Sequence, residues 1–470
     1  MAVDVAGLRA TIIGLGREGT ALARFLAERG ARVTVSDMKG PQALATNLAQ
    51  LEGLDIRYVL GGHPEEILAA DVVFLSAGVP ADAPIAVAAR RRGAALSSEP
   101  RLFTRLCRAP VIGITGSSGK TTTVTLVGKM LEASGWRTVV GGNIGQPLIG
   151  RVDEIQPGDR VVMELSSFQL EGFAAPEPPG RAFPPGGWSP GGAAILNITP
   201  NHLDRHASME AYTAAKANIL RYQGSQDWAV LSADDPVTRG LAGTCRGQVW
   251  RFSQAGAVEA GAYQEGEDLV WASEPGRARH ICRADQVRLR GRHNIANVLA
   301  ACAIAGAAGA GVQAMAEVAI TFTGVEHRLE LVRTHGGVAY YNDSIATSPE
   351  RAIAALRSFS EPVVLLAGGR DKHLAWEEWA ELVSRQVREV VCFGEMVPLL
   401  ERALAQARAA TGQGPRIQTC ATLELAVEAA ARVARPGDVV LLSPGGTSFD
   451  AFADFEARGR AFRAAVWALP

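Results

Sequence analysis

The sequence predicts an α/β fold in three domains. Its 470 residues suffice for about three domains of ~150 residues each. Short apolar runs alternate with helical patterns along the chain, and this alternation is typical of parallel sheets that helices cover on both faces. Glycine-rich loops follow the first apolar run in two of the three segments. We therefore predict domains at residues 1–108, 109–324 and 325–470.

The first segment opens with a predicted βαβ unit. The apolar run Ala10–Ile13 leads into the loop Gly14–Gly19 (GLGREG), a helix that continues through Glu28, and a second strand, Arg32–Ser36, before Asp37. A G-x-G-x-x-G loop with an acidic residue about 20 positions later is typical of a Rossmann-like domain, in which a helix N-terminus meets a pyrophosphate. The loop alone leaves two interpretations open, a dinucleotide cofactor site or a nucleotide-handling fold with another use.

The second segment carries the most specific motif. The apolar run Val111–Ile114 precedes Thr115–Thr122 (TGSSGKTT), and an amphipathic segment, Val124–Leu131, follows. Such a loop turns backbone N–H groups toward a phosphate, and the helix N-terminus adds partial positive charge. Lys120 is expected to reach the β- and γ-phosphates, and the Thr121 hydroxyl to hold Mg²⁺. The sequence thus predicts a P-loop ATPase-like domain; a glycine turn beside a surface lysine is the alternative interpretation.

The motif departs from the usual spacing of a phosphate loop. The usual pattern has glycine five positions before the second loop glycine, but Ile114 stands five before Gly119. The nearest upstream loop glycine is Gly116, which gives a tighter T-G-x-x-G-K-T loop. This difference points to one subgroup of nucleotide-using enzymes.

Polar residues follow two further predicted strands of this segment. Glu164 ends the apolar run Arg160–Glu164, and Asn197–His206 (NITPNHLDRH) follows another. Because α/β folds bind ligands at the carboxyl ends of their strands, Glu164 is a candidate Mg²⁺ ligand and His202 a candidate metal or phosphate contact. A solvated carboxylate and a structural histidine are the alternatives. Lys216, on a predicted helix, is a surface lysine when taken alone.

Three other segments complete the organisation. Ala174–Gly192 is rich in proline and glycine, which excludes a helix or a central strand and indicates an exposed loop. Ile304–Ile320 is apolar but dominated by alanine and glycine, and we interpret it as a buried helix pair rather than a membrane span. The third segment has four apolar runs between helical patterns, at residues 338–341, 363–367, 390–393 and 439–442, and predicts a second Rossmann-like α/β domain.

Composition excludes several functional classes. Forty-seven Lys and Arg against 48 Asp and Glu give a net charge of −1, so neither a nucleic-acid partner nor an anionic membrane is indicated. The six cysteines form no C-x-x-C pair, which argues against a metal knuckle or a disulfide framework and suits a reducing cytosol. No signal-peptide pattern is found at the N-terminus. We expect a cytoplasmic monomer.

Four motifs occur in an order that resembles the Mur ligases, which are ATP-dependent amide-forming enzymes of peptidoglycan synthesis related to folylpolyglutamate synthase. They are Thr115–Thr122, Glu164–Leu170 (ELSSFQL), Asn197–His206 and Gly291–Asn294 (GRHN). The resemblance covers essentially the whole chain. It implies three α/β domains, of which the first binds a UDP substrate, the second ATP and the third an amino acid.

Further motifs resemble the members of this family that add D-glutamate. They are Asn342–Pro349 (NDSIATSP), Gly368–Lys372 (GGRDK), Ser443–Asp450 (SPGGTSFD), and Gly14–Gly19 together with Ser76–Gly78. The D-N-P-R motif of members that add meso-diaminopimelate or lysine is not found. Two positions depart from the pattern. Ile345 stands where lysine is usual, so either one charge is lost or a basic residue such as Arg370 substitutes, and Ala77 replaces the usual proline.

The resemblance implies a reaction in two steps. The carboxylate of UDP-N-acetylmuramoyl-L-alanine attacks the γ-phosphate of ATP to form an acyl phosphate, and the amine of D-glutamate then displaces phosphate. Mg²⁺ and Lys120 neutralise the charge that spreads over the transferring group. The resemblance also implies that CO₂ carbamylates Lys216, which turns an ammonium that would repel Mg²⁺ into an anionic ligand.

The resemblance carries over to individual residues as follows. Catalytic roles are implied for Lys120, His202 and Lys216. ATP binding is implied for Gly116, Ser117, Ser118, Gly119, Lys120, Thr121, Thr122, Asn294, Asn297, Arg328 and Asp343. Metal binding is implied for Thr121, Glu164, His202 and the carbamate of Lys216. Contacts with the UDP substrate are implied for Leu15, Asp37, Lys39, Ser76, Gly78, Asn143 and Ser166. Contacts with D-glutamate are implied for Thr347, Lys372, Ser448 and Phe455.

Other functions stay open at this point. A related ligase with another acceptor amino acid, or one similar to folylpolyglutamate synthase, fits the same loop. A P-loop switch that binds ATP without ligation belongs to a different class. An NAD-linked oxidoreductase is least favoured, because Lys120 and Glu164 would then have no purpose.

Overall fold

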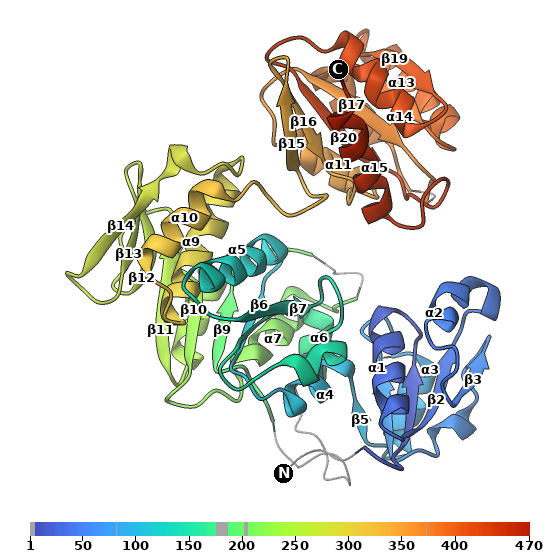
Figure 1. Cartoon of the computed structure of the whole chain (residues 1–470), viewed down its shortest axis with the longest axis vertical. Coiled ribbons are helices and arrows are strands. Elements are labelled where there is room, and N and C mark those ends of the chain that lie inside the picture. Colours follow the sequence, from blue (N-terminus) through green and yellow to red (C-terminus); the bar gives the residue numbers. More distant parts are fainter. Residues whose placement is uncertain (1–4, 81, 175–186, 202–204, 373) are drawn as a thin grey trace. The chain divides into compact units, whose positions relative to one another are not determined.

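The computed structural model describes residues 5–80, 82–174, 187–201, 205–372 and 374–470. Three sheets with flanking helices are seen in these residues (Figure 1), so the α/β fold class is confirmed. The chain divides into two compact units, Met1–Arg288 with Arg292–Thr321, and Leu289–Gly291 with Phe322–Pro470. The first unit holds two of the three sheets. The domain boundaries after residues 108 and 324 therefore stay predictions.

The N-terminal sheet is parallel and has the strand order β3-β2-β1-β4-β5. Its elements in chain order are β1 (Arg9–Ile13), α1 (Arg17–Glu28), β2 (Arg32–Asp37), η1 (Pro41–Leu44), α2 (Ala45–Ala49), β3 (Ile56–Leu60), η2 (Glu65–Leu68), β4 (Val72–Leu75), α3 (Pro84–Arg91), β5 (Leu96–Ser97) and α4 (Glu99–Leu106). The strand order reverses between β1 and β4, and such switch points are where open α/β sheets bind ligands.

Two glycines let the loop after β1 turn tightly into α1. Gly14 has a φ of +96°, which residues with a side chain rarely adopt. A Cβ atom on Gly19 would lie 2.0 Å from the carbonyl oxygen of Gly14, so only glycine allows the helix to pack this closely against the strand end. The loop therefore brings the N-terminus of α1 to the switch point.

The central sheet has the order β14-β13-β12-β11-β10-β9-β6-β8-β7 in the described residues. Its elements in chain order are β6 (Val111–Thr115), α5 (Lys120–Ala133), β7 (Thr138–Gly142), η3 (Leu148–Glu154), β8 (Arg160–Glu164), α6 (Ser167–Gly172), β9 (Gly192–Ile195), α7 (Met209–Ala217), η4 (Asn218–Leu220), β10 (Trp228–Ser232), α8 (Pro236–Gly240), η5 (Leu241–Thr244), β11 (Gln248–Ser253), β12 (Gly261–Glu265), β13 (Asp268–Ala272), β14 (Ala278–Arg283), η6 (Ala284–Gln286), α9 (Arg292–Ala307) and α10 (Val312–Thr321). The predicted helix pair corresponds to α9 and α10.

The expectation of parallel sheets is wrong at one edge of the central sheet. From β7 to β12 the paired strands are parallel, but β13 runs antiparallel to both β12 and β14. Only two residues separate β12 from β13, and the first of them, Gly266, has a φ of +58°. A parallel pair needs a crossover of about a dozen residues or more, so this short glycine turn imposes a hairpin.

The C-terminal sheet has the order β15-β16-β20-β17-β18-β19. Its elements in chain order are β15 (Glu330–His335), β16 (Val338–Asn342), α11 (Pro349–Leu356), β17 (Val363–Gly368), α12 (Glu377–Gln386), β18 (Val387–Phe393), α13 (Val397–Thr411), β19 (Arg416–Cys420), α14 (Leu423–Val433), β20 (Val439–Gly445) and α15 (Phe455–Trp467). β15 is antiparallel to β16, again against expectation, because Gly336 and Gly337 form a two-residue turn with φ of +57° and +77°.

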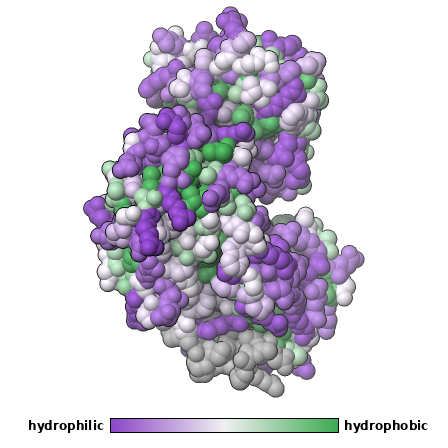
Figure 2. Space-filling model, turned by 60° about the vertical axis from the view of Figure 1, so that its left-hand side comes forward, coloured by the Kyte–Doolittle hydropathy of each residue, from purple (hydrophilic) through white to green (hydrophobic). Residues whose placement is uncertain are grey.

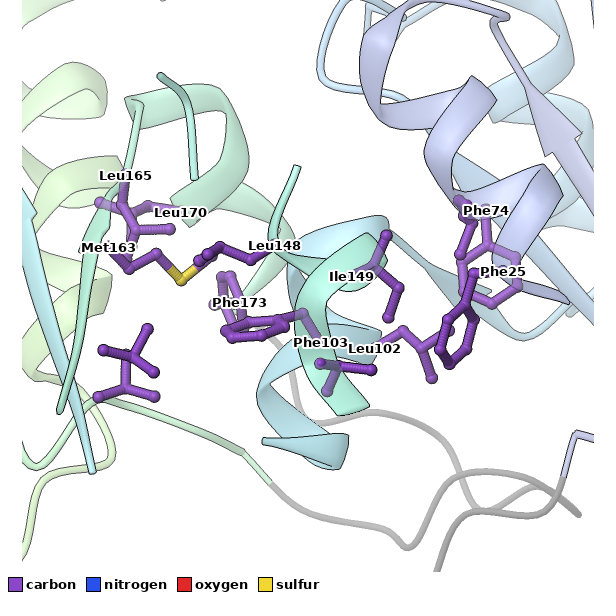
Figure 3. Packing of buried hydrophobic residues seen from close by; sticks show 14 of the residues in the cluster. Phe25, Phe74, Leu102, Phe103, Leu148, Ile149, Met163, Leu165, Leu170 and Phe173 are labelled. Carbon is purple, nitrogen blue, oxygen red and sulfur yellow. The ribbon is translucent and has the colours of Figure 1, made fainter. Parts of the chain in front are cut away.

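Apolar side chains in the first unit form one continuous cluster that spans both of its sheets (Figure 3). Phe25 and Phe74 belong to the N-terminal domain, and Leu165 directly follows β8 of the central sheet. Leu102 on α4 and Ile149 in η3 lie between them, both fully buried. The two sheets of this unit are therefore joined by packed hydrocarbon.

The surface is mostly hydrophilic on the face that Figure 2 shows, with hydrophobic residues in small groups. The large apolar side chains that are exposed come from separate elements, and they are Met38, Tyr58, Leu374, Ile417, Leu425, Phe449 and Trp467. Among the described residues, no helix combines the length and the apolar character that crossing a bilayer requires.

Candidate active site

The phosphate loop joins β6 to α5 at the carboxyl edge of the central sheet. Gly119 adopts a φ of +79° directly before α5 begins at Lys120. The first N–H groups of a helix have no acceptor within the helix, so those of Thr121 and Thr122 are directed along its axis toward the loop. The Lys120 Nζ donates to the Gly116 carbonyl oxygen at 2.9 Å. The lysine thus lies folded over its own loop.

A residue that the sequence reasoning did not single out holds the middle of this loop. The carbonyl oxygen of Asn197 accepts the Ser117 N–H at 3.0 Å, and its side-chain Oδ1 accepts the Ser118 N–H at 2.9 Å. Asn197 follows β9, the strand next to β6. Asn197 is the first residue of the polar segment Asn197–His206, in which His202 was predicted as a site residue. His202 itself lies outside the described residues. The position of Asn197 just after an apolar strand is the sequence signal that could have identified it.

The carboxylate of Glu164 joins the loop to β7. Glu164 ends β8 and is buried. Its Oε2 accepts the Thr121 hydroxyl at 2.9 Å, and its Oε1 accepts the Asn143 Nδ2 at 3.0 Å. The structure therefore brings together Thr121, Glu164 and Asn143, three residues that were predicted from separate motifs.

Lys216 is buried, so interpreting it as a surface lysine is wrong. It lies in the last turn of α7, and its Nζ donates to the Gly116 carbonyl oxygen at 2.9 Å and to the Thr115 Oγ1 at 3.4 Å. Burial lowers the pKa of Lys216 to about 7; the nearby Lys120 lowers it as well, and Glu164 opposes the effect. Its amine is therefore close to the boundary between charged and neutral at physiological pH.

Hydrogen bonds and ring contacts connect the loop to the side chains of Tyr212 and His206. The hydroxyl groups of Ser117 and Tyr212 lie 3.0 Å apart. The ring of His206 lies against that of Tyr212, and its Nε2 is 3.0 Å from the Ser167 hydroxyl. The Lys216 ammonium lies 4.7 Å from the centre of the Tyr212 ring. Tyr212 and His206 were not predicted, although His206 belongs to the same polar motif as His202.

The two asparagines predicted to bind ATP, Asn294 and Asn297, also lie close to the loop. The Asn297 Nδ2 donates to the Asn294 Oδ1 at 2.9 Å, and both residues belong to α9. A Cβ atom on Gly119 would lie 2.2 Å from the Asn297 Oδ1. The second loop glycine is therefore required both by its φ and by the approach of Asn297.

Five of the seven residues predicted to bind the UDP substrate, all except Asn143 and Ser166, lie near the switch point of the N-terminal sheet. The two carboxylate oxygens of Asp37 accept the backbone N–H groups of Leu15 at 2.7 Å and of Lys39 at 2.8 Å. The Ser76 hydroxyl donates to the Gly14 carbonyl oxygen at 2.9 Å. Asp37 and Ser76 thus hold the ends of three strands together. A Cβ atom on Gly78 would meet open space.

Ser166 begins α6 with a reciprocal cap. Its hydroxyl accepts the Gln169 N–H at 3.2 Å, and its backbone N–H donates to the Gln169 Oε1 at 3.0 Å. The Gln169 Nε2 in turn donates to the Glu18 Oε1 at 2.6 Å. A residue of the central sheet layer is therefore connected to the loop that opens α1.

The second unit places Asp343 under the turn that precedes β15. Its carboxylate accepts the Ser443 hydroxyl at 2.9 Å and the Leu329 N–H at 3.2 Å. Burial raises the pKa of Asp343 to about 7, although both hydrogen bonds and the nearby Arg328 lower it. Arg328 stands between two residues with positive φ, His327 at 63° and Leu329 at 45°. This backbone conformation is strained for residues with side chains, and such strain clusters at functional sites.

The residues predicted to hold D-glutamate all lie in the second unit. The Lys372 Nζ donates to the Thr347 Oγ1 at 3.2 Å. Burial lowers the pKa of Lys372, as do the nearby Arg351 and Arg458. Ser448 is buried in the loop after β20, and Phe455 begins α15.

Ile345 stands where lysine is usual, and the side chain of Arg370 pairs with another residue. The guanidinium of Arg370 makes a two-pronged ion pair with Glu395, each contact 2.8 Å long. The Arg351 Nη1 instead donates to the backbone carbonyl of Ile345 at 3.2 Å. Arg351 is therefore a cation next to Ile345, and Arg458 donates to the carbonyl of the preceding residue, Ser344, at 2.9 Å.

The oxygen donors beside the loop fit Mg²⁺ rather than a metal that prefers nitrogen or sulfur. Thr121 and Glu164 provide two oxygens within 2.9 Å of each other. Among the described residues, no three His, Cys, Asp or Glu side chains gather as a metal cluster. Mg²⁺ typically takes one or two carboxylates together with substrate phosphates and water, so a small set of protein donors is what it requires.

The chain is similar to known proteins in both family and fold. Three family models match the chain, namely the Mur ligase MurD-like N-terminal domain at residues 8–98, the Mur ligase middle domain at 114–305, and the Mur ligase glutamate ligase domain at 327–446.

Curated relatives match along nearly the full length. The UDP-N-acetylmuramoylalanine--D-glutamate ligase of Symbiobacterium thermophilum is 45% identical over 465 residues, covering 98% of each chain. The enzymes of the same name from Roseiflexus sp. and Geobacter metallireducens are 43% and 42% identical, each covering 99% of both chains.

Solved structures agree in fold at low sequence identity. The UDP-N-acetylmuramate-alanine ligase of Thermotoga maritima matches with a TM-score of 0.58 and 19% identity, covering 98% of this chain and 99% of that one. A pseudomurein peptide ligase type C from Methanothermus fervidus matches with a TM-score of 0.52 and 17% identity, covering 98% and 99%.

Proposed function

The chain belongs to the Mur ligase family, and from this premise we propose that it joins D-glutamate to UDP-N-acetylmuramoyl-L-alanine. The observation that carries the proposal is the similarity of this chain, over almost its whole length, to relatives that are named for this activity. ATP is the co-substrate, in keeping with the family. The product is a precursor of peptidoglycan, and we place the reaction in the cytoplasm, on a monomer that needs neither nucleic acid nor a membrane.

The residues of the loop activate the substrate carboxylate in this proposal. A carboxylate is a poor electrophile, so it must first take the γ-phosphoryl group of ATP. The N–H groups at the start of α5 bind the phosphates, and Lys120 leaves the Gly116 carbonyl to neutralise the charge that spreads over the transferring group. The amine of D-glutamate then attacks the acyl phosphate and phosphate leaves.

Metal binding at this site is part of the proposal. Thr121 and Glu164, with His202 and a carbamate on Lys216, would hold Mg²⁺, which when bound supplies positive charge to the phosphates. A carbamate suits the position of Lys216, because two lysine ammonium groups converge there on one carbonyl oxygen. Converting one ammonium to an anion removes that repulsion.

Three further groups of residues have roles in the proposal. The N-terminus of α1 binds the pyrophosphate of the UDP substrate, with Leu15, Asp37, Lys39, Ser76 and Gly78 around it and with Asn143 and Ser166 on the central sheet. In the second unit, Lys372 pairs with a carboxylate of D-glutamate beside Thr347, Ser448 and Phe455. Asn294 and Asn297 in the first unit are proposed ATP contacts, and so, in the second unit, are Arg328 and Asp343.

The proposal is tested by supplying purified protein with ATP, Mg²⁺, UDP-N-acetylmuramoyl-L-alanine and isotope-labelled D-glutamate. Mass spectrometry should show one labelled glutamyl group attached to the sugar nucleotide. If D-glutamate is replaced by hydroxylamine, the acyl phosphate should be captured as a hydroxamate. ATP binding without either product would instead favour an ATP-driven switch, and turnover only with another amino acid would favour a related ligase.

A further inference from the structure

One carboxylate beside the proposed sugar-nucleotide site has no role in the chemistry described above. Glu18 is the second residue of α1 and belongs to the loop at the N-terminal switch point. Its Oε1 accepts the Gln169 Nε2 at 2.6 Å, and the same carboxylate accepts the backbone N–H of Ala77. Burial raises the pKa of Glu18, and both donors oppose that effect because they favour the ionised form.

The contact with Glu18 fixes the NH₂ end of the Gln169 amide. A carboxylate accepts hydrogen bonds, so it selects the NH₂ end of the amide and leaves the Oε1 end for Ser166. That oxygen accepts the Ser166 N–H at 3.0 Å and lies 3.1 Å from the Ser166 hydroxyl, which donates to it. The Ser166 N–H can only donate and so selects the same orientation from the other end; without the acceptor at Glu18, the NH₂ end of the amide loses the partner that holds it.

The orientation of the amide then fixes the hydrogen-bonding character of Ser166. A serine hydroxyl has one proton and two lone pairs. The proton goes to the Gln169 Oε1, and one lone pair accepts the Gln169 N–H at 3.2 Å. What remains is one lone pair, so Ser166 can only accept a hydrogen bond from a ligand. The sugar-nucleotide substrate offers amide N–H and hydroxyl groups as donors.

The contact with Ala77 connects the same carboxylate to the loop after β4. Ala77 stands between Ser76 and Gly78, both proposed to bind the UDP substrate. Proline has no N–H, so the alanine at this position is what allows the loop to donate to Glu18. The carboxylate and the alanine therefore work as a pair in this chain.

We propose that Glu18 is a positioning residue for the sugar-nucleotide substrate, holding the Ser76–Gly78 loop while it orients Gln169 so that Ser166 accepts a hydrogen bond from an N–H or O–H of that substrate. The inference rests on the proposed function, since it names how that substrate is recognised. Glu18 acts through Gln169 and touches no reacting atom.

The test measures the dissociation constant of UDP-N-acetylmuramoyl-L-alanine by calorimetry for three variants of the full chain. Glu18→Gln can present its single oxygen to only one of the two donors, so affinity should fall about 10-fold, as expected for a lost hydrogen bond to a charged group. The double variant Glu18→Gln/Gln169→Glu should recover most of it. There the residue 18 amide donates to the residue 169 carboxylate and accepts the Ala77 N–H, while that carboxylate accepts from Ser166.

Gln169→Leu keeps Glu18 but removes the amide, so it should weaken sugar-nucleotide binding as Glu18→Gln does. The dissociation constant of ATP is the internal reference and should change less than about twofold in each variant. Glu28→Gln, an exposed carboxylate at the other end of α1, is the matched control. The recovery in the double variant separates orientation from general stability, because a purely structural role of Glu18 does not require the exchanged pair to restore binding.

The outcomes are distinguishable. If the unmodified protein does not bind the sugar nucleotide, both the proposed function and this inference are wrong. If it binds, and either Glu18→Gln or Gln169→Leu binds equally well, the inference alone is overturned. If Glu18→Gln does not fold, the comparison of Gln169→Leu with the unmodified protein decides.

Discussion

The side chains of Lys120 and Lys216 donate to the same carbonyl oxygen, that of Gly116, each at 2.9 Å. Lys120 begins α5 and Lys216 lies in the last turn of α7, and their side chains converge on the phosphate loop. Two ammonium groups this close repel each other, which is one cause of the lowered pKa of Lys216. The arrangement is stabilised if one lysine turns to a phosphate and the other loses its positive charge.

Removing the second lysine should therefore abolish turnover. We expect Lys216→Ala to lower kcat by on the order of 100-fold or more, because an anionic group beside the phosphates is lost. Short carboxylic acids should restore part of the activity by occupying the vacated space. Phosphate release measured with and without added acetate or formate checks this, with Lys129→Ala on the exposed face of α5 as the control. Full activity of Lys216→Ala without a supplement would contradict the carbamate proposal.

The second loop glycine should be irreplaceable. In Gly119→Ala the added Cβ meets the Asn297 Oδ1 and the residue must hold a φ of +79°. If ATP binding requires this loop conformation, strain of about 1–3 kcal/mol corresponds to roughly a 5- to 150-fold loss of ATP affinity. Calorimetric titration with ATP checks this. Gly150→Ala is the matched control, since its Cβ would meet open space. Equal ATP affinity of both variants would show that the close approach of Asn297 is unimportant.

Lys372 should affect the amino acid and not the nucleotide. Lys372→Ala removes a charge-assisted contact worth about 1.5–3 kcal/mol, so the KM for D-glutamate should rise roughly 10- to 100-fold. The KM for ATP should stay nearly unchanged. Steady-state kinetics with each substrate varied in turn checks this, with Arg385→Ala on the exposed face of α12 as the control. A D-glutamate KM equal to that of the unmodified protein would remove Lys372 from the site.

Stability should depend on pH through Glu99. This buried carboxyl accepts the Ile149 N–H at 2.9 Å, and burial raises its pKa to about 8, with the nearby Glu18 adding to the effect. The folded state therefore favours the protonated form. Its stabilising contribution is complete below the unfolded pKa of about 4.5 and is lost as the pH rises through about 8.

Glu99→Gln mimics the protonated acid and should flatten this dependence. Between pH 6 and pH 8.5 the Tm of the unmodified protein should fall more than that of the variant, by an amount that reflects a few kcal/mol at most, since one pKa unit corresponds to about 1.4 kcal/mol. Thermal unfolding followed by fluorescence at several pH values checks this. Parallel pH profiles for the two proteins would show that Glu99 does not titrate in this range.

Much of the site could be predicted because its parts lie next to recognisable strands. Thr121 lies in the helix after β6 and Glu164 is the last residue of β8. The edge where these parallel strands end brings the two side chains together regardless of their distance in sequence. Lys216 could not be placed in this way. It lies on a helix whose packing against the loop is a tertiary contact, and no local pattern distinguishes its buried side chain from a solvated one.

The same limit explains what the sequence reasoning missed. Asn197 and Tyr212 act through contacts with the loop serines, and each contact joins residues about 80 or more positions apart. The antiparallel edge at β15 had a local signal, because Gly336 and Gly337 stand directly before the apolar run at residues 338–341. The regular alternation of strands and helices elsewhere outweighed it.

The central claim, that this ligase adds D-glutamate, is tested most directly by phosphate release. The unmodified protein is supplied with ATP, Mg²⁺ and UDP-N-acetylmuramoyl-L-alanine, and D-glutamate, L-glutamate, L-lysine and meso-diaminopimelate are added in separate reactions. We predict release that depends on D-glutamate and stays at background with the other three. Release with one of those three and none with D-glutamate would contradict the claim.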